Sequence, residues 1–293
     1  MRQSVMLWVQ FNVNILIMPE SNYQSVTSIT FIDLVGVGVA QFLRGQLTIN
    51  ADLLDKNTAK LAALCNHKGR IIALFHIVAI DDGFRLIMPR SIVEVSLAHI
   101  KKYAVFFKLE VINSDDSNIL ACISKKKEEK DTRDGVSIEG SNLQLKFESS
   151  EIADNSTSKN DFFWNWHLLE NGIPWLTTET VEHFLPHSLN LPELGAIDFN
   201  KGCFTGQEVI ARMQYKGKLK QHLRGLSTSN KTLIPPLSSL EQSNKKVAQI
   251  VCSAVHPDKD QRVLAVVKDS ANSDKIFQLN LKNASILELE IIP

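Results

Sequence analysis

The stretch Lys201-Gly202-Cys203-Phe204-Thr205-Gly206-Gln207-Glu208-Val209-Ile210-Ala211-Arg212 is the most informative part of this chain. Its Thr205-to-Glu208 spacing is that of a capping box, which predicts a helix over residues 206–214. Cys203 would lie just before the positive end of that helix, with Lys201 beside it. Such surroundings favour the thiolate, so Cys203 is a candidate reactive thiol, and a buried inert cysteine is the alternative.

The same run resembles the signature of the YgfZ family, folate-binding proteins related to the aminomethyltransferase (T-protein) of the glycine cleavage system. The family pattern is approximately K-G-C-[FY]-x-G-Q-E-x-x-A-R, and every fixed position is matched. The signature positions besides the cysteine are Lys201, Gly202, Gly206, Gln207, Glu208 and Arg212. Residues 44–48 and 101–108 resemble two further family segments. The resemblance extends from about residue 28 to the end of the chain.

This resemblance implies an α+β fold of three packed subdomains, with a small C-terminal β-barrel-like domain. Residues 1–216 would form a folate-binding, aminomethyltransferase-like region of two subdomains, and residues 217–293 the barrel-like domain. The sequence patterns agree with this division. They predict helices at 39–45 and 91–100, strands at 28–34, 70–80, 84–88, 105–111 and 119–124, and closely spaced strands at 247–255, 262–267, 276–280 and 285–292.

Composition limits the function classes. The chain has 293 residues, 44% of them hydrophobic, and equal numbers of basic and acidic side chains. Zero net charge argues against a wholly basic nucleic-acid-binding protein, although a local basic patch is compatible with it. Cys65, Cys122, Cys203 and Cys252 are far apart and form no CxxC pair, so we expect no metal site and no disulfide framework. A reducing, cytoplasmic setting fits.

The N-terminal segment, residues 1–19, is apolar enough to suggest a signal peptide. Polar residues interrupt it, no small-residue cleavage pattern follows, and it alternates as a strand does. We interpret it as a strand or an unusual leader. No later segment has about eighteen unbroken apolar residues, so no membrane span is expected.

Residues 162–174 resemble the family's folate segment, a helix that ends in Glu-x-Gly. Glu170 falls where the relatives place the glutamate that binds the pteridine, and Trp164 falls on a tryptophan linked to folate in YgfZ proteins. A carboxylate and an aromatic slot suit a pterin ring. A second folate-linked tryptophan of the family corresponds to Thr27 here. The alternative is that Trp164 and Trp166 are core anchors.

The chain departs from the enzymatic relatives at two positions that matter for catalysis. Aminomethyltransferases carry an aspartate pair, which includes the catalytic acid, after a Gly-Gly-Ile-Ile type run. Here Ala73 and Leu74 occupy those positions, and neither side chain exchanges a proton. Aminomethyltransferase activity is therefore disfavoured, and a non-catalytic folate-binding protein is expected. His76, which lies nearby in an apolar run, is interpreted as a structural histidine.

Together these features predict an accessory or regulatory protein that binds tetrahydrofolate or a related folate. Its partners would be iron–sulfur enzymes, such as radical enzymes that modify tRNA. Cys203, next to the tetrahydrofolate site, would be the redox- or cluster-responsive group. A folate-dependent one-carbon (aminomethyl) transferase is the alternative. Direct tRNA binding is not expected at zero net charge. The lysines at 216, 218 and 220 could contact phosphate or a polyglutamate tail, or form an ordinary solvated turn.

Overall fold

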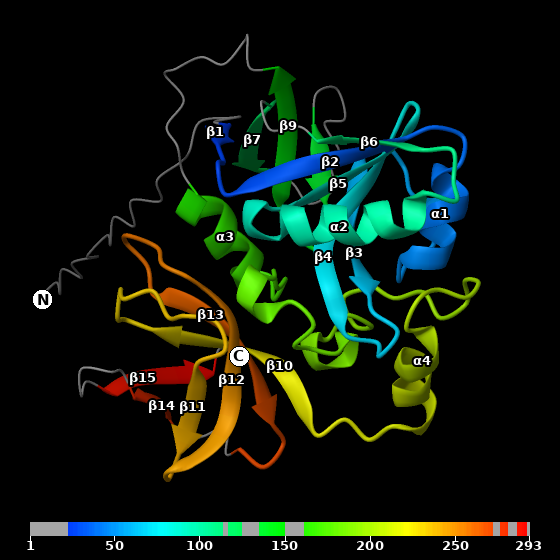
Figure 1. Cartoon of the computed structure of the whole chain (residues 1–293). Helices are drawn as coiled ribbons and strands as arrows, with labels where there is room; N and C mark the ends of the chain where they lie inside the picture. The colour runs from blue at the N-terminus through cyan, green and yellow to red at the C-terminus, as the bar shows by residue number, and fades with distance from the viewer. Residues whose placement is uncertain are drawn as a thin grey trace, which may run out of the picture.

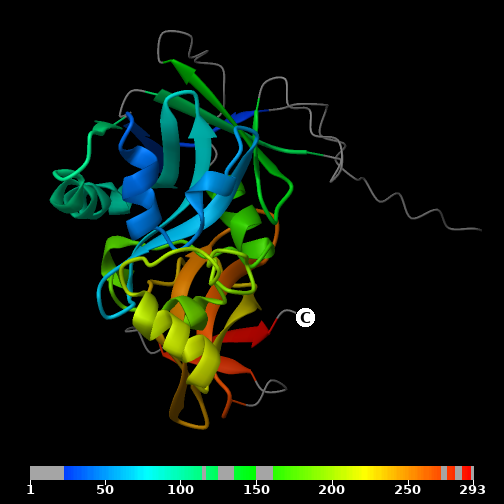
Figure 2. The same cartoon turned by 90° about the vertical axis from the view of Figure 1, so that its right-hand side faces the viewer.

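The structure is a computed structural model that describes residues 23–113, 117–124, 135–149, 161–271, 276–280 and 286–291. The strand or leader expected over residues 1–19 lies outside these ranges. Within them the chain forms a body of mixed helix and sheet, followed by a β-barrel. Figures 1 and 2 both show the barrel below the sheet-containing body.

A nine-stranded sheet forms the centre of the body, counted over the described ranges. Its strand order is β1-β7-β9-β8-β3-β4-β5-β2-β6, and the β3–β8 pair is parallel while the other pairs are antiparallel. The strands are β1 Gln24–Ser25, β2 Ile29–Val35, β3 Thr58–Cys65, β4 Ile71–Ile80, β5 Gly83–Pro89, β6 Glu110–Asn113, β7 Ser117–Ile123, β8 Val136–Ile138 and β9 Leu143–Ser149. The first eight residues of β4 are buried, as expected for a central strand rich in branched apolar side chains.

Four α-helices lie around this sheet in the described part of the chain. They are α1 Val39–Gln46, α2 Val93–Ala104, α3 Asp161–Glu170 and α4 Gln207–Lys216. Short 3₁₀ turns occur at Ala51–Leu53, Arg90–Ile92, Thr178–Thr180 and Pro186–Leu189. Helix α3 lies between the sheet and the barrel on one side of the molecule, and α4 lies on the other side (Figure 1).

The C-terminal strands close into a barrel of order β10-β13-β12-β11-β14-β15, in which β15 pairs back with β10. Their bounds are β10 Gln221–Thr228, β11 Ser239–Gln242, β12 Lys245–Ala254, β13 Gln261–Lys268, β14 Phe277–Asn280 and β15 Ile286–Ile291. One apolar cluster fills the barrel, with Leu226, Ile250 and Phe277 almost fully buried. The other face of β12 and β13 contributes Cys252 and Leu264 to the core of the body, so the two parts share an apolar interface.

The expected fold class, including the barrel-like C-terminal region, is confirmed. The predicted strand at 105–111 is wrong over its first half, because residues 105–109 form a turn and β6 begins only at Glu110. This turn passes closely over two glycines. A Cβ atom added at Gly36 or Gly38 would lie 2.9 or 2.7 Å from backbone atoms of Lys108. The close backbone approach therefore replaces strand pairing there.

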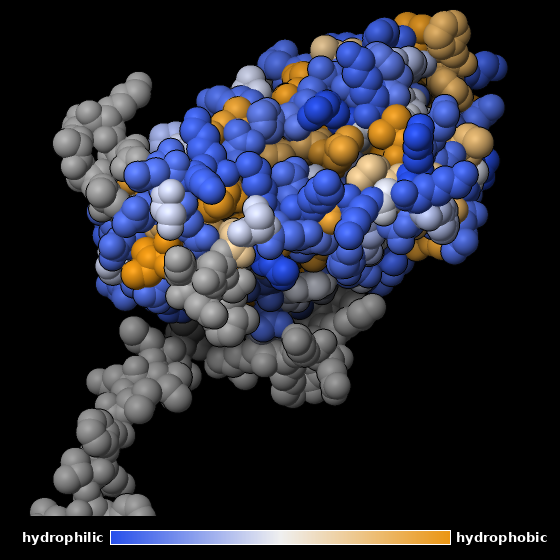
Figure 3. Space-filling view, turned by 90° about the horizontal axis from the view of Figure 1, so that it is seen from below, coloured by the Kyte–Doolittle hydropathy of each residue, from blue (hydrophilic) through white to orange (hydrophobic). Residues whose placement is uncertain are grey.

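None of the helices in the described ranges is long and apolar enough to cross a membrane. Seen from below, the molecule is mostly hydrophilic, with apolar residues in small separate patches (Figure 3). A continuous apolar patch of several hundred Å² would be expected for a large apolar interface on that face.

Candidate functional site

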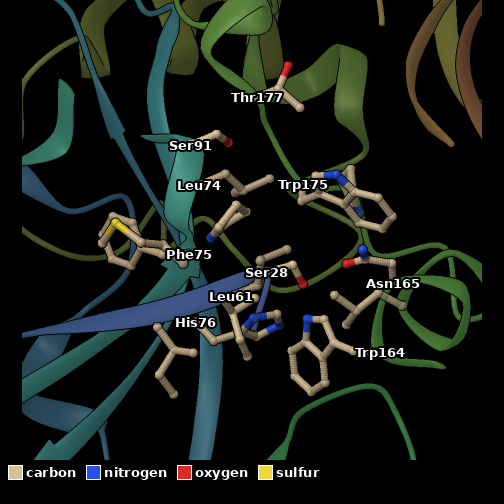
Figure 4. A pocket seen from close by; sticks show the side chains of 16 residues that line it. Ser28, Leu61, Leu74, Phe75, His76, Ser91, Trp164, Asn165, Trp175 and Thr177 are labelled. Atoms are coloured by element: carbon tan, nitrogen blue, oxygen red, sulfur yellow. The ribbon is translucent and has the colours of Figure 1, made fainter. Parts of the chain in front are cut away.

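An apolar cavity of about 250 Å³ lies between α3 and the sheet. Its walls come from four strands or strand ends and from the segment that follows α3. The lining residues are Ser28, Ile29, Leu61, Leu74, Phe75, His76, Ile87, Met88, Pro89, Ser91, Trp164, Asn165, Leu168, Pro174, Trp175 and Thr177 (Figure 4). None of these described residues is an acid, a lysine or an arginine, so the cavity presents no permanent charge.

His76 is the polar feature that stands out in this cavity. Its side chain comes from the middle of the buried strand β4, and only 6% of its surface is exposed. The Nε2 atom is buried and has no hydrogen-bond partner. Burial lowers the pKa of His76 to about 4, so the imidazole is neutral at physiological pH. A buried ring nitrogen without a partner is costly in the free protein, and a bound polar molecule can satisfy it.

Aromatic side chains provide the opposite wall. Figure 4 shows Trp164 and Trp175 along one side of the cavity, with Asn165 between them, and His76 close to Ser28 and Trp164. Trp164 is 98% buried and is among the largest fully enclosed side chains. An indole face beside a neutral hydrogen-bonding group suits a flat heterocycle better than an ion.

The start of α3 explains how Trp164 is positioned. The Asp161 carboxylate accepts hydrogen bonds from the backbone N–H groups of Thr27, at 2.6 Å, and Ser28, at 2.7 Å, and also one from the Thr27 hydroxyl. Partial burial raises the pKa of Asp161, but these hydrogen bonds outweigh it and the net pKa is lowered. The ionised carboxylate thus ties the helix to the start of β2. Thr27 takes part in this anchor and is not in the cavity lining.

Helix α3 presents two faces with different roles. Trp164 and Leu168 line the cavity, whereas Trp166 and Glu170 face the barrel. The Trp166 Nε1–H donates to the carbonyl of Asp260 at 2.9 Å. The lysine and arginine over the Trp166 ring are Lys259, with Nζ 4.3 Å from the ring centroid, and Arg262, with Cζ 5.3 Å from it.

Glu170 lies outside the cavity lining. Its carboxylate pairs with the Arg262 guanidinium, with Nε–Oε2 3.2 Å and Nη2–Oε1 3.5 Å. This bidentate pair links α3 to β13 at the edge of the apolar interface. The contact of Glu170 with a pterin stays a prediction, and in the structure the carboxylate is already engaged.

Ala73 and Leu74, the residues at the positions of the aspartate pair, lie on neighbouring positions of β4 but on different sides of it. Leu74 lines the cavity, and Ala73, its neighbour on β4, is fully buried beside β3. Both positions are therefore apolar, and of the two only Leu74 forms part of the cavity wall. The cavity lining contributed by the described residues contains no carboxylate at all.

The signature run packs along residues 45–48, a segment that also resembles the family. Two donors of the run bond to carbonyls of this segment, Thr205 N–H to Gly45 at 3.0 Å and Lys201 Nζ to Leu47 at 2.7 Å. Just before the run, Asp198 N–H donates to the Thr48 carbonyl at 2.9 Å. The loop is therefore fixed on both sides of Cys203. The Cys203 side chain is exposed, so the alternative that Cys203 is buried is wrong, and its role as a reactive thiol stays a prediction.

The expected capping box is wrong. Helix α4 does begin near the predicted residue, but its N-cap is Gly206 and no side chain caps it. The Thr205 hydroxyl points instead to the Gly45 carbonyl, at 3.4 Å. Gly206 has φ +84°, and a Cβ atom there would lie 2.5 Å from the carbonyl oxygen of Asn66. Close packing of the β3–β4 turn against the loop thus decides the geometry, and it requires a glycine.

Lys201 is directed away from solvent. Its Nζ lies 5.2 Å from the Phe204 ring centroid in addition to its bond to Leu47. Burial lowers the pKa of Lys201 to about 8, although Asp198 opposes the shift. Its ammonium group is thus half-buried and bonded to the Leu47 carbonyl. Of the remaining signature positions, Gly202, Glu208 and Arg212 are exposed, and Gln207 is partly buried.

The Cys203 thiol and the cavity beneath α3 are not in contact. Cys203 is absent from the cavity lining, and α4, which follows it, lies on the other side of the body from α3 (Figures 1 and 2). The other cysteines, Cys65, Cys122 and Cys252, are buried and unpaired. No group of three or more metal-ligating side chains occurs in the part of the chain that the structure describes.

Comparison with known proteins finds relatives that match this chain over most of its length. Proteins named tRNA-modifying protein YgfZ match from Vibrio atlanticus (28% identity, 76% of this chain and 75% of the relative), Buchnera aphidicola (29%, 87% and 90%) and Escherichia coli (28%, 89% and 89%). The resemblance to the YgfZ family is confirmed. No family model matches the chain.

Among solved structures, the aminomethyltransferase T of the glycine cleavage system from Bartonella henselae superposes with a TM-score of 0.69. The match covers 92% of this chain and 84% of the other at 14% sequence identity. It shows that the two proteins share a fold. The YgfZ-like signature loop and the cavity beneath α3 are thus carried on an aminomethyltransferase-type scaffold.

Proposed function

We propose that this chain is a folate-binding accessory protein that supports iron–sulfur enzymes, and through them the modification of tRNA. The relatives' names support the link to tRNA modification, and the shared fold supports a folate-related ligand. The observation that carries the binding proposal is the unpartnered, buried Nε2 of His76, which faces an uncharged cavity walled by Trp164.

The cavity suits the pterin end of a folate. Its volume of about 250 Å³ is near the lower limit of ligand pockets, which are roughly 300–1,000 Å³, so it accommodates a ring system and not the whole cofactor. The pterin ring is flat, uncharged and rich in hydrogen-bonding atoms. Trp164 would stack on or border the ring, and His76 would bond to one of its nitrogen or oxygen atoms. The charged glutamate end would lie outside this uncharged lining.

The matched tryptophans of α3 test this placement. Binding of 5-formyltetrahydrofolate is measured by calorimetry for Trp164→Ala and Trp166→Ala. Trp164→Ala is expected to weaken binding by about tenfold, because it removes an aromatic wall of the cavity. Trp166→Ala is expected to leave affinity nearly unchanged. Equal losses, or no loss with Trp164→Ala, would show that the ligand binds elsewhere. Glu170→Ala in the same series tests the predicted carboxylate contact.

A role as a folate-dependent one-carbon transferase is the second candidate, and no observation favours it. Transfer of a methylene group needs a residue that exchanges a proton near the reacting carbon, and the cavity contributes Leu74 at the critical wall. Methylenetetrahydrofolate formation from an aminomethyl donor, followed by absorbance, tests this candidate. Turnover above the uncatalysed rate would require His76, or a group outside the described lining, to exchange the proton.

We place the second part of the role, service to iron–sulfur enzymes, at Cys203. Its thiol is exposed on a loop held by hydrogen bonds on both sides, which leaves the sulfur accessible to a partner protein. The test is restoration of tRNA modification in cells that lack the protein. Wild-type chain is expected to restore it, and Cys203→Ala to fail. Full restoration by Cys203→Ala would remove the special role of the thiol.

A further inference from the structure

A second cleft, of about 320 Å³, lies between the body and the barrel. The body supplies Arg70, from the start of β4, and residues 183–188. The barrel supplies residues of β10, β11, β12 and β13. Backbone hydrogen bonds hold residues 182–184 against the start of β4, because Ile71 N–H donates to the Phe184 carbonyl at 3.0 Å and Glu182 N–H to the Ile71 carbonyl at 2.8 Å. The cleft is therefore a feature of two packed parts and not of one loose loop.

The cleft is cationic. Arg70, Lys246 and Lys268 line it from three separate elements, and the described residues of its lining include no carboxylate. The hydrogen bonds made by these cations go to backbone carbonyls: Arg70 Nη1 bonds to His183, and Lys268 Nζ bonds to Lys246 at 2.9 Å. None of the three forms an ion pair with any carboxylate in the ranges the structure describes. Three cations that share one cleft repel one another, and a bound anion relieves this repulsion.

Three acids lie near the cleft but outside its lining, and one of them, Glu241 on β11, is the cross-strand partner of Lys246 without forming an ion pair with it among the described residues. Glu182 precedes the lining segment, but its carboxylate accepts a hydrogen bond from the Asn66 amide at 3.0 Å. Asp269 follows Lys268, and its carboxylate lies 3.6 Å from His222 Nε2. Both carboxylates are thus oriented by other partners. The exposed lysines at 216, 218 and 220 precede Gln221, a lining residue, and add positive charge along the approach.

The rest of the lining indicates what kind of anion would fit. Phe184, Ala248 and Val266 form an apolar floor, and each is more than 90% buried. Gln221, Gln249 and Ser239 add uncharged polar groups at the sides. An apolar floor beside several cationic donors suits a molecule with a flat apolar part and a group of three acceptor oxygens. Phosphate has that acceptor geometry, and a nucleobase is such a flat part.

We propose that this cleft binds the phosphate group of a nucleotide, either free or within an RNA chain. The site is separate from the cavity under α3, and the proposal does not depend on folate binding. Arg70 would contact the phosphate through its guanidinium plane, Lys246 and Lys268 as point charges, and the base would rest against Phe184.

Calorimetry with adenosine 5′-monophosphate, and fluorescence anisotropy with a short labelled single-stranded RNA, test this proposal on the full chain. The double variant Lys246→Ala/Lys268→Ala is expected to weaken binding by about tenfold or more, since two charge-assisted contacts are lost. The matched control is Lys101→Ala/Lys102→Ala in the last turn of α2, which should stay within about twofold. These four lysines are exposed, so both variants should fold; far-ultraviolet circular dichroism checks this.

The results distinguish a free nucleotide from RNA as the source of the phosphate, and they distinguish both from other ligands. Binding of the mononucleotide supports a free nucleotide, and binding of RNA alone supports a phosphate within a chain. Adenosine, which lacks the phosphate, should bind at least about tenfold more weakly than the monophosphate. The proposal is overturned if wild-type protein binds neither probe, if adenosine binds as well as the monophosphate, or if the α2 control loses as much affinity. It is also overturned if only a γ-linked triglutamate binds, because the anion would then be a carboxylate.

Discussion

Replacing His76 by leucine should make the free protein more stable and its ligand binding weaker. The Nε2 atom of His76 is buried without a partner, which costs about 1–3 kcal/mol of folding free energy. Leucine is apolar and of similar size, and the surrounding wall contains Leu61, Leu74 and Ile87. We therefore expect His76→Leu to raise the free energy of unfolding by about 1–2 kcal/mol at pH 7. For a chain of this size that corresponds to a rise in Tm of about 2–6 °C.

The same substitution removes the hydrogen bond that the cavity offers to a ligand. A net loss of about 1–1.5 kcal/mol predicts that the Kd for 5-formyltetrahydrofolate rises about tenfold. Thermal unfolding gives the first quantity and calorimetry the second. His76→Gln, which keeps a neutral donor and acceptor, should retain more of the affinity than His76→Leu.

A second buried histidine provides the control. His187 also has one unpartnered ring nitrogen, Nδ1, while its Nε2 lies 3.2 Å from the Gln214 side-chain oxygen. It does not line the cavity. His187→Leu should leave ligand affinity unchanged. The reasoning about His76 fails if His76→Leu lowers stability by more than about 1 kcal/mol while affinity is unchanged, because the imidazole would then be a satisfied structural group.

Three further predictions follow from the same geometry. Burial holds the pKa of His76 and that of His167 at about 4, below the unfolded value of about 6.5, so the unfolded chain binds more protons between these values. The free energy of unfolding should therefore fall as the pH drops from 6.5 to 4, by up to about 3 kcal/mol for His76 alone, and a denaturant series should show a shallower fall in His76→Leu. Trp166→Phe removes the hydrogen bond to Asp260 and should cost about 1–2 kcal/mol in urea unfolding; an unchanged midpoint would mean that the bond contributes nothing at the interface of α3 with the barrel. Cys203→Ala changes an exposed side chain and should alter stability by less than about 0.5 kcal/mol and leave folate affinity intact; a larger loss in either measurement would assign the thiol a structural role.

The division of α3 into two faces was predictable from its sequence. Trp164 and Leu168 are four residues apart, as are Trp166 and Glu170, and helical geometry alone places each pair on one side. What each face contacts was not predictable. The Arg262 that engages Glu170 lies 92 positions away in the chain, and only the packing of β13 against α3 brings it there. We expected Glu170 to contact a pterin because of its position at the end of the helix, and that expectation did not take Arg262 into account.

His76 shows the opposite case. A single polar residue within the apolar run of β4 is a visible signal, and we interpreted it as structural because no second ligand-type residue stood near it in sequence. Its possible role arises from Trp164 and Ser28, which come from distant segments and meet it across the cavity. The cationic cleft is likewise invisible in sequence, since Arg70, Lys246 and Lys268 come from the body and the barrel.

The sequence by itself determined the family resemblance, the mixed fold with its terminal barrel, and the absence of an acid at positions 73 and 74. These properties can be recognised from local sequence patterns and residue identity, without knowing which distant residues lie nearby in the fold. Tertiary structure alone decided that Gly206 ends the loop in place of a capping box, that Lys201 turns inward, and that Cys203 and the cavity occupy different parts of the body. Each of these depends on which distant backbone lies against the segment, because close contacts and burial are set by the whole packed chain.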